Sequence, residues 1–252
     1  MKKFLVYLLV VLTCFHGSIA HASTEIKVEE VSKENDYFDG SYVYVDVWFD
    51  DIYNFKTYID DKDTISGLVS KVEDEDPLLA INGDFWNHRL DDKIIVRNGE
   101  VLSDEVKYDI RDYCVIYNGG TMVTYHHGDI EDLSILTKNA WQVFSFGPQL
   151  VHKGEPILDY SDIYDTDLSN YSHPRTAIGY FEPNHYCFLV VAGRNMEDHG
   201  CFLEDMAQFF ADKGCKEAYN LDGGGSSHIW FMGKELGVPS EDRPIPDIIY
   251  IT

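Results

Sequence analysis

The sequence predicts an α+β fold, in which a mixed β-sheet core and a few packed helices form a single domain. Three observations support this prediction. Short apolar segments with strand periodicity recur along the chain, and one segment in the last third has an apolar stripe with helical spacing. Strands are also predicted on both sides of that helix. The length of 252 residues suits one large α/β or β-rich domain.

The N-terminus has the pattern of a secretory signal peptide. Lys2 and Lys3 precede an apolar run at residues 4–12, and the small-residue pattern Ala20-His21-Ala22 follows. The run is too short to span a membrane as a helix, and no later stretch approaches ~20 apolar residues. We therefore expect a secreted or extracytoplasmic protein without an integral membrane segment. The predicted parts are a signal peptide at 1–22, a polar, partly disordered lead-in at 23–40 and the domain at 41–252.

Charge and cysteine content limit the partners and the covalent links. With 44 acidic and 20 basic residues, the formal net charge of −24 repels nucleic acid and anionic membranes, and nothing specifies an oligomeric state. Lipidation of Cys14 is an alternative route to export. Cleavage would remove Cys14 and leave Cys114, Cys187, Cys201 and Cys215. These allow three disulfide connectivities or buried free thiols, although a helix predicted between Cys201 and Cys215 disfavours that pair.

The first half of the chain predicts two strands, a helix and a hairpin. Apolar residues alternate at 42–48, which indicates a strand with one buried face. Helical spacing at 64–72 is followed by an acidic loop and a buried strand at 78–81. Residues 113–117 and 122–125 flank an Asn-Gly step, and this pattern predicts a β-hairpin.

The second half predicts strands around one amphipathic helix. The nearly continuous apolar run at 186–192 indicates a strand covered on both faces. A helix follows at 202–212, with Gly214 just past its end, where a left-handed residue commonly terminates a helix. Short strands are expected at 218–221 and 228–232.

A glycine-rich segment between those last two strands is the strongest indication of a site. It reads Asn220-Leu221-Asp222-Gly223-Gly224-Gly225-Ser226-Ser227. Three consecutive glycines cost backbone entropy, which indicates a close approach by a ligand or by another backbone, and exposed amides there could bind an anion. The alternative is a tight turn with a surface Asp222. The segment lacks the spacing of a phosphate-binding P-loop, and Ser226 lacks the final glycine of a nucleophile elbow.

Arginine is scarce, and three of the six lie beside Pro or Gly turns in the last third: Arg175, Arg194 and Arg243. The guanidinium group matches phosphate and carboxylate geometry, so these residues suit an anionic substrate; alternatively, each pairs with an acid. No cofactor is identified, and no spacing names a metal, although a divalent cation such as calcium remains open. The segment at 165–176 lacks the glycine and glutamate of an EF-hand. His126-His127 lacks a third ligand at zinc spacing and is expected to be a loop pair.

Six segments in order resemble the phosphodiester glycosidase family over roughly residues 60–252. The most specific are His173-Pro174-Arg175-Thr176-Ala177-Ile178-Gly179 and the glycine-rich segment at 220–227. The other four are Ile81-Asn82-Gly83-Asp84-Phe85, Gly147-Pro148-Gln149-Leu150-Val151, Gly193-Arg194 and the segment from Pro239 to Pro244. The aromatics Phe85 and Trp86 offer a surface on which a sugar ring can stack.

The resemblance implies an exported hydrolase that cuts the C1–O bond of a sugar-1-phosphodiester, α-N-acetylglucosamine or a related sugar, in a polysaccharide such as an exopolysaccharide or in a glycoconjugate. It points to catalytic roles for Asp222, Arg175 and Glu204, with Asp222 as nucleophile or base and Arg175 and Arg194 stabilising the departing phosphate. The substrate-binding residues it implies are Asn82, Asp84, His173, Arg194, Gly223, Gly224, Gly225, Ser226 and Arg243. Two alternatives stay open: a non-catalytic module that binds phosphate-bearing polysaccharide, and a metal-dependent phosphodiesterase.

Overall fold

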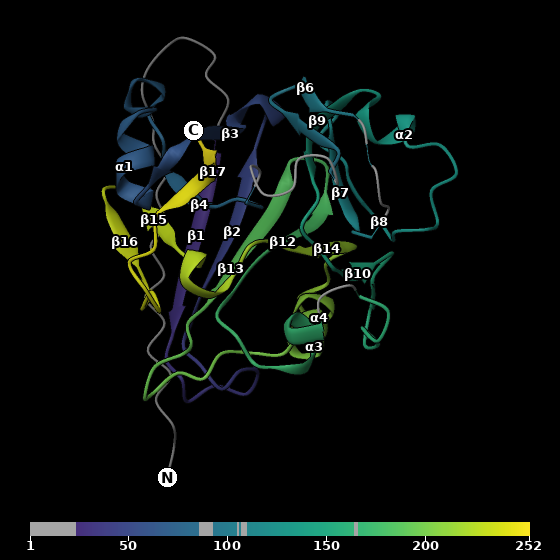
Figure 1. The fold of residues 1–252 in the computed structure, drawn as a ribbon. Helices are drawn as coiled ribbons and strands as arrows, with labels where there is room; N and C mark the ends of the chain where they lie inside the picture. Colours follow the sequence, from purple (N-terminus) through teal and green to yellow (C-terminus); the bar gives the residue numbers. More distant parts are fainter. Residues whose placement is uncertain (1–23, 86–92, 105, 107–109, 164–165) are drawn as a thin grey trace.

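The computed structural model describes residues 24–85, 93–104, 106, 110–163 and 166–252. They form three β-sheets with a small number of helices packed around them (Figure 1). The predicted signal peptide at 1–22 lies outside the described residues. No helix in the part of the chain described above is long and apolar enough to cross a membrane.

The largest sheet has seven strands in the order β1-β2-β13-β12-β14-β10-β11. Their bounds are β1 Thr24–Val31, β2 Tyr42–Phe49, β10 Gln149–His152, β11 Glu155–Pro156, β12 Arg175–Glu182, β13 His185–Val191 and β14 Glu217–Asn220. Strand β1 pairs with β2 along its whole length. The expected polar, partly disordered lead-in at 23–40 is therefore corrected, because nearly half of it, Thr24–Val31, is an edge strand of this sheet.

The two smaller sheets have five strands each. One has the order β16-β15-β4-β17-β3 and the other β6-β5-β9-β7-β8. The bounds in the first are β3 Phe55–Asp63, β4 Leu79–Asn82, β15 Ile229–Phe231, β16 Lys234–Leu236 and β17 Ile245–Ile251. Those in the second are β5 Ile95–Arg97, β6 Glu100–Ser103, β7 Tyr113–Tyr117, β8 Met122–Tyr125 and β9 Ala140–Phe144. The predicted hairpin is confirmed as β7 and β8.

The sheet is antiparallel rather than mixed, and the fold is mostly β, so α+β describes it only loosely. Every pairing between described strands is antiparallel, for example β12 with β13 and β12 with β14. Strands β13 and β14 run in the same direction, as the intervening helix led us to expect. However, β12 lies between them in the sheet. The connection from β13 through α4 to β14 therefore passes over β12, and β13 and β14 do not pair with each other.

The helices are short except for one. Helix α4 runs from Leu203 to Lys213 and ends at Gly214, whose φ of 88° confirms the predicted left-handed cap. The predicted helix at 64–72 is shorter, α1 Ile65–Ser70, and Thr64 caps it by accepting a hydrogen bond from the Gly67 amide. The others are α2 Ser134–Thr137, α3 Thr166–Asn170, and the 3-10 turns η1 Ile52–Asn54, η2 Glu73–Glu75 and η3 Gly224–Ser226.

The three sheets share one apolar core, which makes the described chain a single domain. Val43 and Val45 of the first sheet, Ile81 of the second and Phe144 of the third belong to the same buried cluster. The other face of β2 is also covered, because Tyr44 packs edge-on against Phe209 of α4. The prediction of one buried face for this strand was wrong, since the sheet lies between the core and α4.

The four described cysteines are buried free thiols. The nearest pair is Cys187 and Cys215, whose Sγ atoms lie 3.6 Å apart. Cys215 therefore lies beside Cys187 of β13, above Gly179 of the intervening strand β12, rather than beside Cys201 near the start of α4. This agrees with the separation that the helix imposes.

Candidate active site

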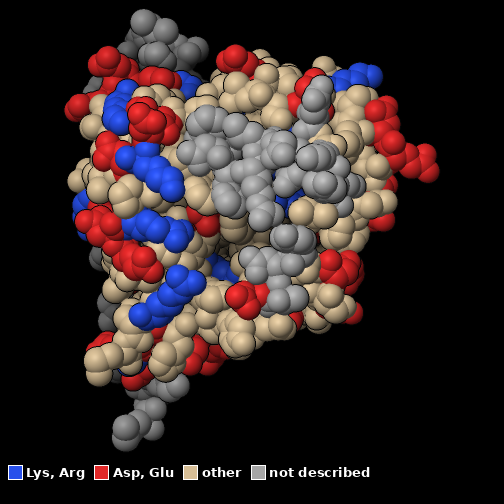
Figure 2. Space-filling view, viewed as in Figure 1, with Lys and Arg blue, Asp and Glu red and all other residues tan. Residues whose placement is uncertain are grey.

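A cavity of about 310 Å³ lies where the three sheets meet, and Asp222 is in its wall. The described residues that line it are Lys62, Phe85, Arg111, Phe146, Leu168, Asp222, Ser226, Arg243, Pro244 and Pro246. Figure 2 shows basic side chains in and beside a hollow on one face of the molecule, with acidic side chains between and around them. The cavity combines one carboxylate, three cations and two aromatic rings.

Two of the cations, Lys62 and Arg111, are positioned by contacts with aromatic residues of the cavity wall. The Lys62 ammonium lies 4.8 Å from the ring centroid of Phe85, and the Arg111 guanidinium carbon lies 5.9 Å from that of Phe146. Arg111 also donates to the Phe146 carbonyl at 3.2 Å. Among the described lining residues, three basic side chains face a single acid. The cavity is therefore locally cationic in a protein of net charge −24.

Arg243 is the cation nearest to Asp222. Its Nη2 donates to the Gly223 carbonyl at 3.0 Å and lies 3.6 Å from Asp222 Oδ2, and its Nε donates to the Ser226 hydroxyl at 3.1 Å. The Arg243 side chain keeps 42% of its surface exposed. It can therefore reach an anion in the cavity while it remains attached to the Asp222 turn.

Strand β14 delivers Asp222 to the cavity. The strand ends at Asn220, and the next two amides continue onto neighbouring strands: Leu221 donates to the Thr176 carbonyl at 2.8 Å and Asp222 to that of Gly83 at 3.2 Å. Asp222 Oδ1 accepts from the Gly223 amide at 2.9 Å. The carboxylate is thus fixed by backbone bonds on both sides of the turn.

Burial raises the pKa of Asp222, and hydrogen bonding by Ser226, the charge of Arg243 and the Gly223 amide act in the opposite direction. Its side chain is 12% exposed, toward the cavity. A carboxyl group with a raised pKa in a partly dry wall is a stronger base and nucleophile once ionised than a solvated one.

Two of the three glycines, Gly223 and Gly224, are required by the protein's own packing. A Cβ at Gly223 would lie 2.8 Å from the Pro174 carbonyl oxygen, and one at Gly224 would lie 2.8 Å from Arg194 Nη1. Gly224 also has a φ of 61°, a left-handed conformation that favours glycine. The predicted close approach is present, but it is made by the chain itself. Ser226, by contrast, lines the cavity.

Asn82 supports the Asp222 turn from behind. Its Nδ2 donates to the Asp222 carbonyl at 2.7 Å, and its Oδ1 accepts from the Thr176 hydroxyl at 2.7 Å and from the His228 amide at 3.2 Å. The residue is 1% exposed. Both ends of this amide are therefore occupied by protein groups, and its position fits a positioning role better than the substrate contact that we expected.

Asp84 lies beneath the cavity in a buried charged cluster. Its Oδ1 pairs with Arg97 Nη2 at 2.5 Å, and its Oδ2 accepts from the Ser145 amide at 2.8 Å. Lys93 donates to the backbone carbonyls of Asp84 and Phe85. The fully buried Asp84 side chain does not line the cavity, so its position does not fit the predicted substrate contact.

Asp247 shares this cluster, and its pKa is raised to about 7 by burial and by the charge of Asp84. Its Oδ2 accepts from the Asp84 amide at 3.1 Å. Burial also disfavours the ionised form of Asp84, but Arg97 and Lys93 outweigh it and hold the pKa of Asp84 below its usual range. Asp84 is therefore the ionised member of the pair, and Asp247 keeps its proton up to near-neutral pH.

Arg175 is buried behind the cavity wall. Its Nη2 donates to the carbonyls of Leu168 and Tyr171 at 2.7 and 3.1 Å, and its Nε donates to that of Cys201 at 3.3 Å. Burial lowers the pKa of Arg175, and Glu204 in the first turn of α4 acts in the opposite direction. Neither Arg175 nor Glu204 lines the cavity, but Leu168 does. Arg175 therefore holds a segment of the wall in place.

Arg194 and His173 form a second contact with the glycine turn. Arg194 Nη2 and His173 Nδ1 lie 3.1 Å apart, and Arg194 Nη1 lies 3.7 Å from Glu241. Arg194 has a φ of 59°, in the left-handed region. Both residues are outside the lining of the cavity, on the other side of the Gly224 backbone.

One group of described side chains has the composition of a metal site. Asp112, His126 and His127 place one possible ligand atom each within 4.8 Å of one another. The expectation that His126-His127 lacks a third ligand was wrong, because Asp112 stands before β7 and its neighbours in space come from the turn after β8. Asp112 and His126 are 14 residues apart in sequence, and the hairpin of β7 and β8 brings them together.

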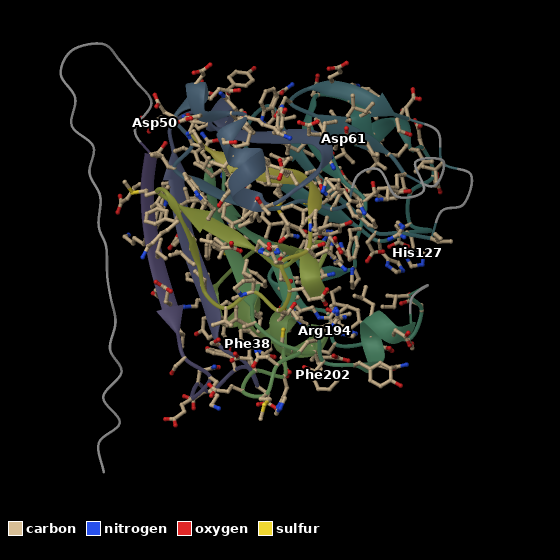
Figure 3. All side chains as sticks on the ribbon, turned by 60° about the vertical axis from the view of Figure 1, so that its left-hand side comes forward. Phe38, Asp50, Asp61, His127, Arg194 and Phe202 are labelled. Atoms are coloured by element: carbon tan, nitrogen blue, oxygen red, sulfur yellow. The ribbon has the colours of Figure 1, made fainter. Side chains whose placement is uncertain are left out.

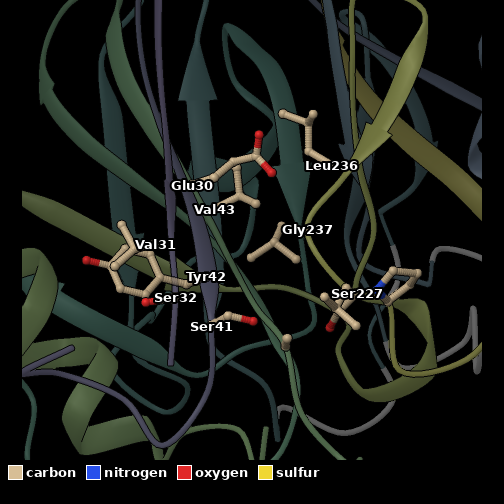
Figure 4. A pocket seen from close by; sticks show the side chains of 13 residues that line it. Glu30, Val31, Ser32, Ser41, Tyr42, Val43, Ser227, Leu236 and Gly237 are labelled. Carbon is tan, nitrogen blue, oxygen red and sulfur yellow. The ribbon is translucent and has the colours of Figure 1, made fainter. Parts of the chain in front are cut away.

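A second cavity, of about 240 Å³, lies between β2 and the segment 236–239. Figure 4 shows Ser227 on one side of it and Ser41 and Tyr42 on the other. Its described lining includes Glu30 but no basic side chain, so it suits an anion poorly. The cavity at Asp222 is therefore the better candidate site.

Sequence reasoning missed Lys62, Arg111, Phe146 and Asp247. The scarcity of arginine would have singled out Arg111 as readily as Arg243, but Arg111 is distant in sequence from the glycine segment. Lys62 lies within an acidic run, and Asp247 lies within an apolar strand, so neither had a local motif. Trp86, which was expected to offer a stacking surface, lies outside the described residues, whereas Phe85 lines the cavity.

The fold and the cavity define a three-sheet β protein with a carboxylate and several cations at the meeting point of its sheets. Residues 76–252 match the family model of the phosphodiester glycosidases, and the chain therefore belongs to this family. This confirms the resemblance noted in the sequence.

Comparisons with individual proteins agree on the fold. The described fold is similar to that of the catalytic domain of zebrafish N-acetylglucosamine-1-phosphodiester α-N-acetylglucosaminidase, auto-inhibited by its pro-peptide, with a TM-score of 0.66 and 16% identity over 98% of this chain and 88% of that one. A hypothetical protein from Synechocystis has a TM-score of 0.56 and 14% identity, over 98% of this chain and 68% of that one.

In sequence, the chain is 29% identical over 220 residues to the uncharacterized SPbeta prophage-derived protein YomE of Bacillus subtilis strain 168. The match covers 79% of this chain but only 32% of YomE. The chain therefore spans about a third of the length of the curated relative that it matches.

Proposed function

We propose that this chain is an exported glycosidase that hydrolyses the C1–O bond of a sugar-1-phosphodiester. The observation that carries the proposal is the cavity at Asp222, in which three cations and one carboxylate line the wall of a strongly acidic protein. Such a cavity favours an anionic ligand, and its carboxylate can act at a carbon centre. The signal-peptide pattern at the N-terminus supports export.

In this mechanism an Asp222 oxygen attacks C1, or removes a proton from a water molecule that does so. The C1–O bond breaks, and its electron pair leaves with the phosphate. One water molecule is consumed, and the products are a free sugar and a phosphate monoester. The monoester has a second pKa near ~6, so it leaves readily without protonation by a general acid. One carboxylate among the described lining residues is compatible with this requirement.

The departing phosphate would be stabilised by Arg243, Arg111 and Lys62. Arg243 lies 3.6 Å from Asp222, and the other two stand over aromatic rings of the same wall. This replaces our sequence-based assignment of the phosphate to Arg175 and Arg194, because neither lines the cavity. Arg175 would act indirectly, through the segment that carries Leu168. Fixed cations around developing negative charge lower the barrier without reorganisation.

The sugar would stack on Phe85 or Phe146, which line the cavity beside Lys62 and Arg111. The name of the zebrafish protein specifies an N-acetylglucosamine-1-phosphodiester α-N-acetylglucosaminidase. We therefore propose α-N-acetylglucosamine or a related sugar, carried by a polysaccharide or glycoconjugate. The aromatic faces accept any pyranose, so the sugar is decided by polar contacts beyond them.

The test is hydrolysis of an N-acetylglucosamine-1-phosphodiester in water enriched in oxygen-18. The proposal predicts free sugar that carries the label, because C1 is the atom attacked. Label in the phosphate would instead identify a phosphodiesterase. Saturable binding of several sugar-1-phosphodiesters with no release of sugar would identify a binding module. Either of these two results would overturn the proposal.

A further inference from the structure

We infer that Asp112, His126 and His127 form a binding site for one divalent transition-metal ion of the zinc type. The Oδ1 atom of Asp112 lies 3.0 Å from His126 Nδ1 and 2.9 Å from His127 Nδ1. A tetrahedral zinc ion with bonds of about 2.0–2.1 Å holds its ligand atoms ~3.3 Å apart. Both printed distances from Asp112 Oδ1 therefore lie within a few tenths of an ångström of this spacing, and all three ligand atoms lie within 4.8 Å of one another.

The carboxylate is fixed before any ion binds. Asp112 is 4% exposed, its Oδ1 accepts from the His127 amide at 2.9 Å, and its Oδ2 accepts from the Gln149 amide at 2.9 Å. Two backbone amides from different segments thus hold the carboxylate in one orientation. A preorganised ligand loses little entropy when the ion binds, so the two imidazoles are the only groups that must be ordered.

His126 also has the outer partner that metal-binding histidines usually have. Its second ring nitrogen, Nε2, lies 3.2 Å from Asp162 Oδ2. When an ion takes the place of the proton on Nδ1, the ring keeps its other proton on Nε2, and a carboxylate at that nitrogen accepts it and holds the orientation of the ring. The arrangement places Asp162 behind His126 and Asp112 in front of it.

The ligand set selects the class of ion. Two imidazole nitrogens and one carboxylate oxygen suit zinc and its first-row neighbours, whereas calcium and magnesium prefer a shell of oxygen atoms. The His126 and His127 side chains are 34% and 20% exposed, so solvent can supply a fourth ligand. In Figure 3 His127 lies at the rim of the molecule, on the side opposite Asp50.

The position of the site suggests what the ion would do. Arg111, which lines the cavity at Asp222, directly precedes Asp112, and Asp162 belongs to the segment that leads to α3. An ion would join these two parts of the wall. None of its three ligands is among the described residues that line the cavity. The inference concerns a structural site and is independent of the proposed reaction.

The experiment measures metal binding in the full chain, produced without a polyhistidine tag and stripped with a chelator. Titration with zinc chloride, followed by calorimetry, should give one ion per chain, and cobalt should give the strong visible absorption of a tetrahedral complex. His127→Ala should weaken zinc binding by more than about 100-fold, and Asp162→Asn by about 10- to 100-fold. The control His199→Ala removes an exposed histidine that pairs with Asp39 alone and should leave binding unchanged.

Circular dichroism of each variant would show that the fold is retained. The His127 amide, which holds Asp112, is preserved in His127→Ala. Failure of the stripped wild-type chain to bind zinc would overturn the inference. So would zinc binding of equal strength in wild type and His127→Ala, because the ion would then lie elsewhere.

Discussion

Two neighbouring charged regions of this molecule, a lower, buried cluster and an upper one in the cavity wall, differ in what surrounds their charged groups. In the lower region Asp84 and Arg97 are buried and satisfy each other, with Asp247 beside them. In the upper region Asp222 and Arg243 face a cavity and are only partly neutralised. A charge that is already paired stabilises or organises the fold, whereas a charge that faces a cavity is available to a ligand. Mutations should therefore separate stability from activity along this division.

The largest effect is expected from Asp222→Asn. The amide cannot act as nucleophile or base, so the kcat for release of sugar should fall by roughly 10⁴-fold, while the unfolding temperature changes little. The measurement is initial rate with an N-acetylglucosamine-1-phosphodiester, together with a thermal melt. Asp74→Asn, at an exposed acid of η2, is the matched control and should keep the wild-type rate. A fully active Asp222→Asn variant would exclude the role that we assign to Asp222.

Asp84→Asn should have the opposite profile. It breaks the buried pair with Arg97 and leaves Asp247, 3.8 Å from Arg97 Nη2, as the acid beside that guanidinium. Breaking a buried ion pair typically costs about 3–5 kcal/mol. We expect this loss in the free energy of unfolding, measured with urea, and nearly normal KM in the protein that remains folded. Asp60→Asn, which breaks an exposed pair with Lys71, is the control and should change stability little. If Asp84→Asn raised KM without loss of stability, our original expectation of a substrate contact would be restored.

Arg243→Ala should reduce kcat/KM by roughly 100-fold, because it removes a cation from the developing phosphate charge. Arg243→Lys should recover part of the rate, since it keeps the charge but loses the fork that holds Ser226 and Gly223. Steady-state kinetics with an anionic and a neutral leaving group would locate the effect. A loss of the same size with the neutral group would assign Arg243 to structure, and Lys138→Ala serves as a surface control.

The most gradual effect is a pH dependence of stability from Asp247. Its pKa is raised to about 7 by burial and by the charge of Asp84, so the folded state keeps a proton that the unfolded state loses near pH ~4. Its contribution to stability is fully present below that pH and is lost as the pH rises to about 7, with a slope of about 1 kcal/mol per pH unit.

Asp247→Asn should flatten this decline, because the amide is neutral at every pH. Urea unfolding between pH 4.5 and 7.5 would measure the slope in both proteins. Some decline should remain in the variant, since burial raises the pKa of Asp222 as well. Equal slopes would mean that Asp247 is ionised throughout the range.

Local patterns predicted most of the elements, and the errors arose where distant segments meet. The hairpin at β7 and β8, helix α4 and its Gly214 cap depend on periodicity and on single-residue conformation, and all three were correct. The prediction of a mixed sheet was wrong because no single segment of sequence determines the order of the strands. Strand β1 was missed because its sequence is largely polar and gives a weak alternating pattern. The strand is defined by its pairing with β2.

The lining of the candidate cavity was also predicted only in part, for the same reason. Asp222, Ser226 and Arg243 share a short stretch of sequence, and the fold keeps them together in one wall. Arg175 and Asp84 also belong to segments that resemble the family, yet their side chains are buried. A motif shows that a residue type is needed at a position. It does not show whether that residue stabilises the turn or contacts the ligand.

By itself, the sequence determined the family, the glycine-rich turn with Asp222, and the acidic character against which any cation would stand out. Those properties reside in contiguous residues or in composition. Only the tertiary structure decided which cations reach the cavity, which acids are paired beneath it, and that Asp112 meets two histidines from beyond the hairpin. These depend on the packing of three sheets, where side chains far apart in the chain come within a few ångströms of each other.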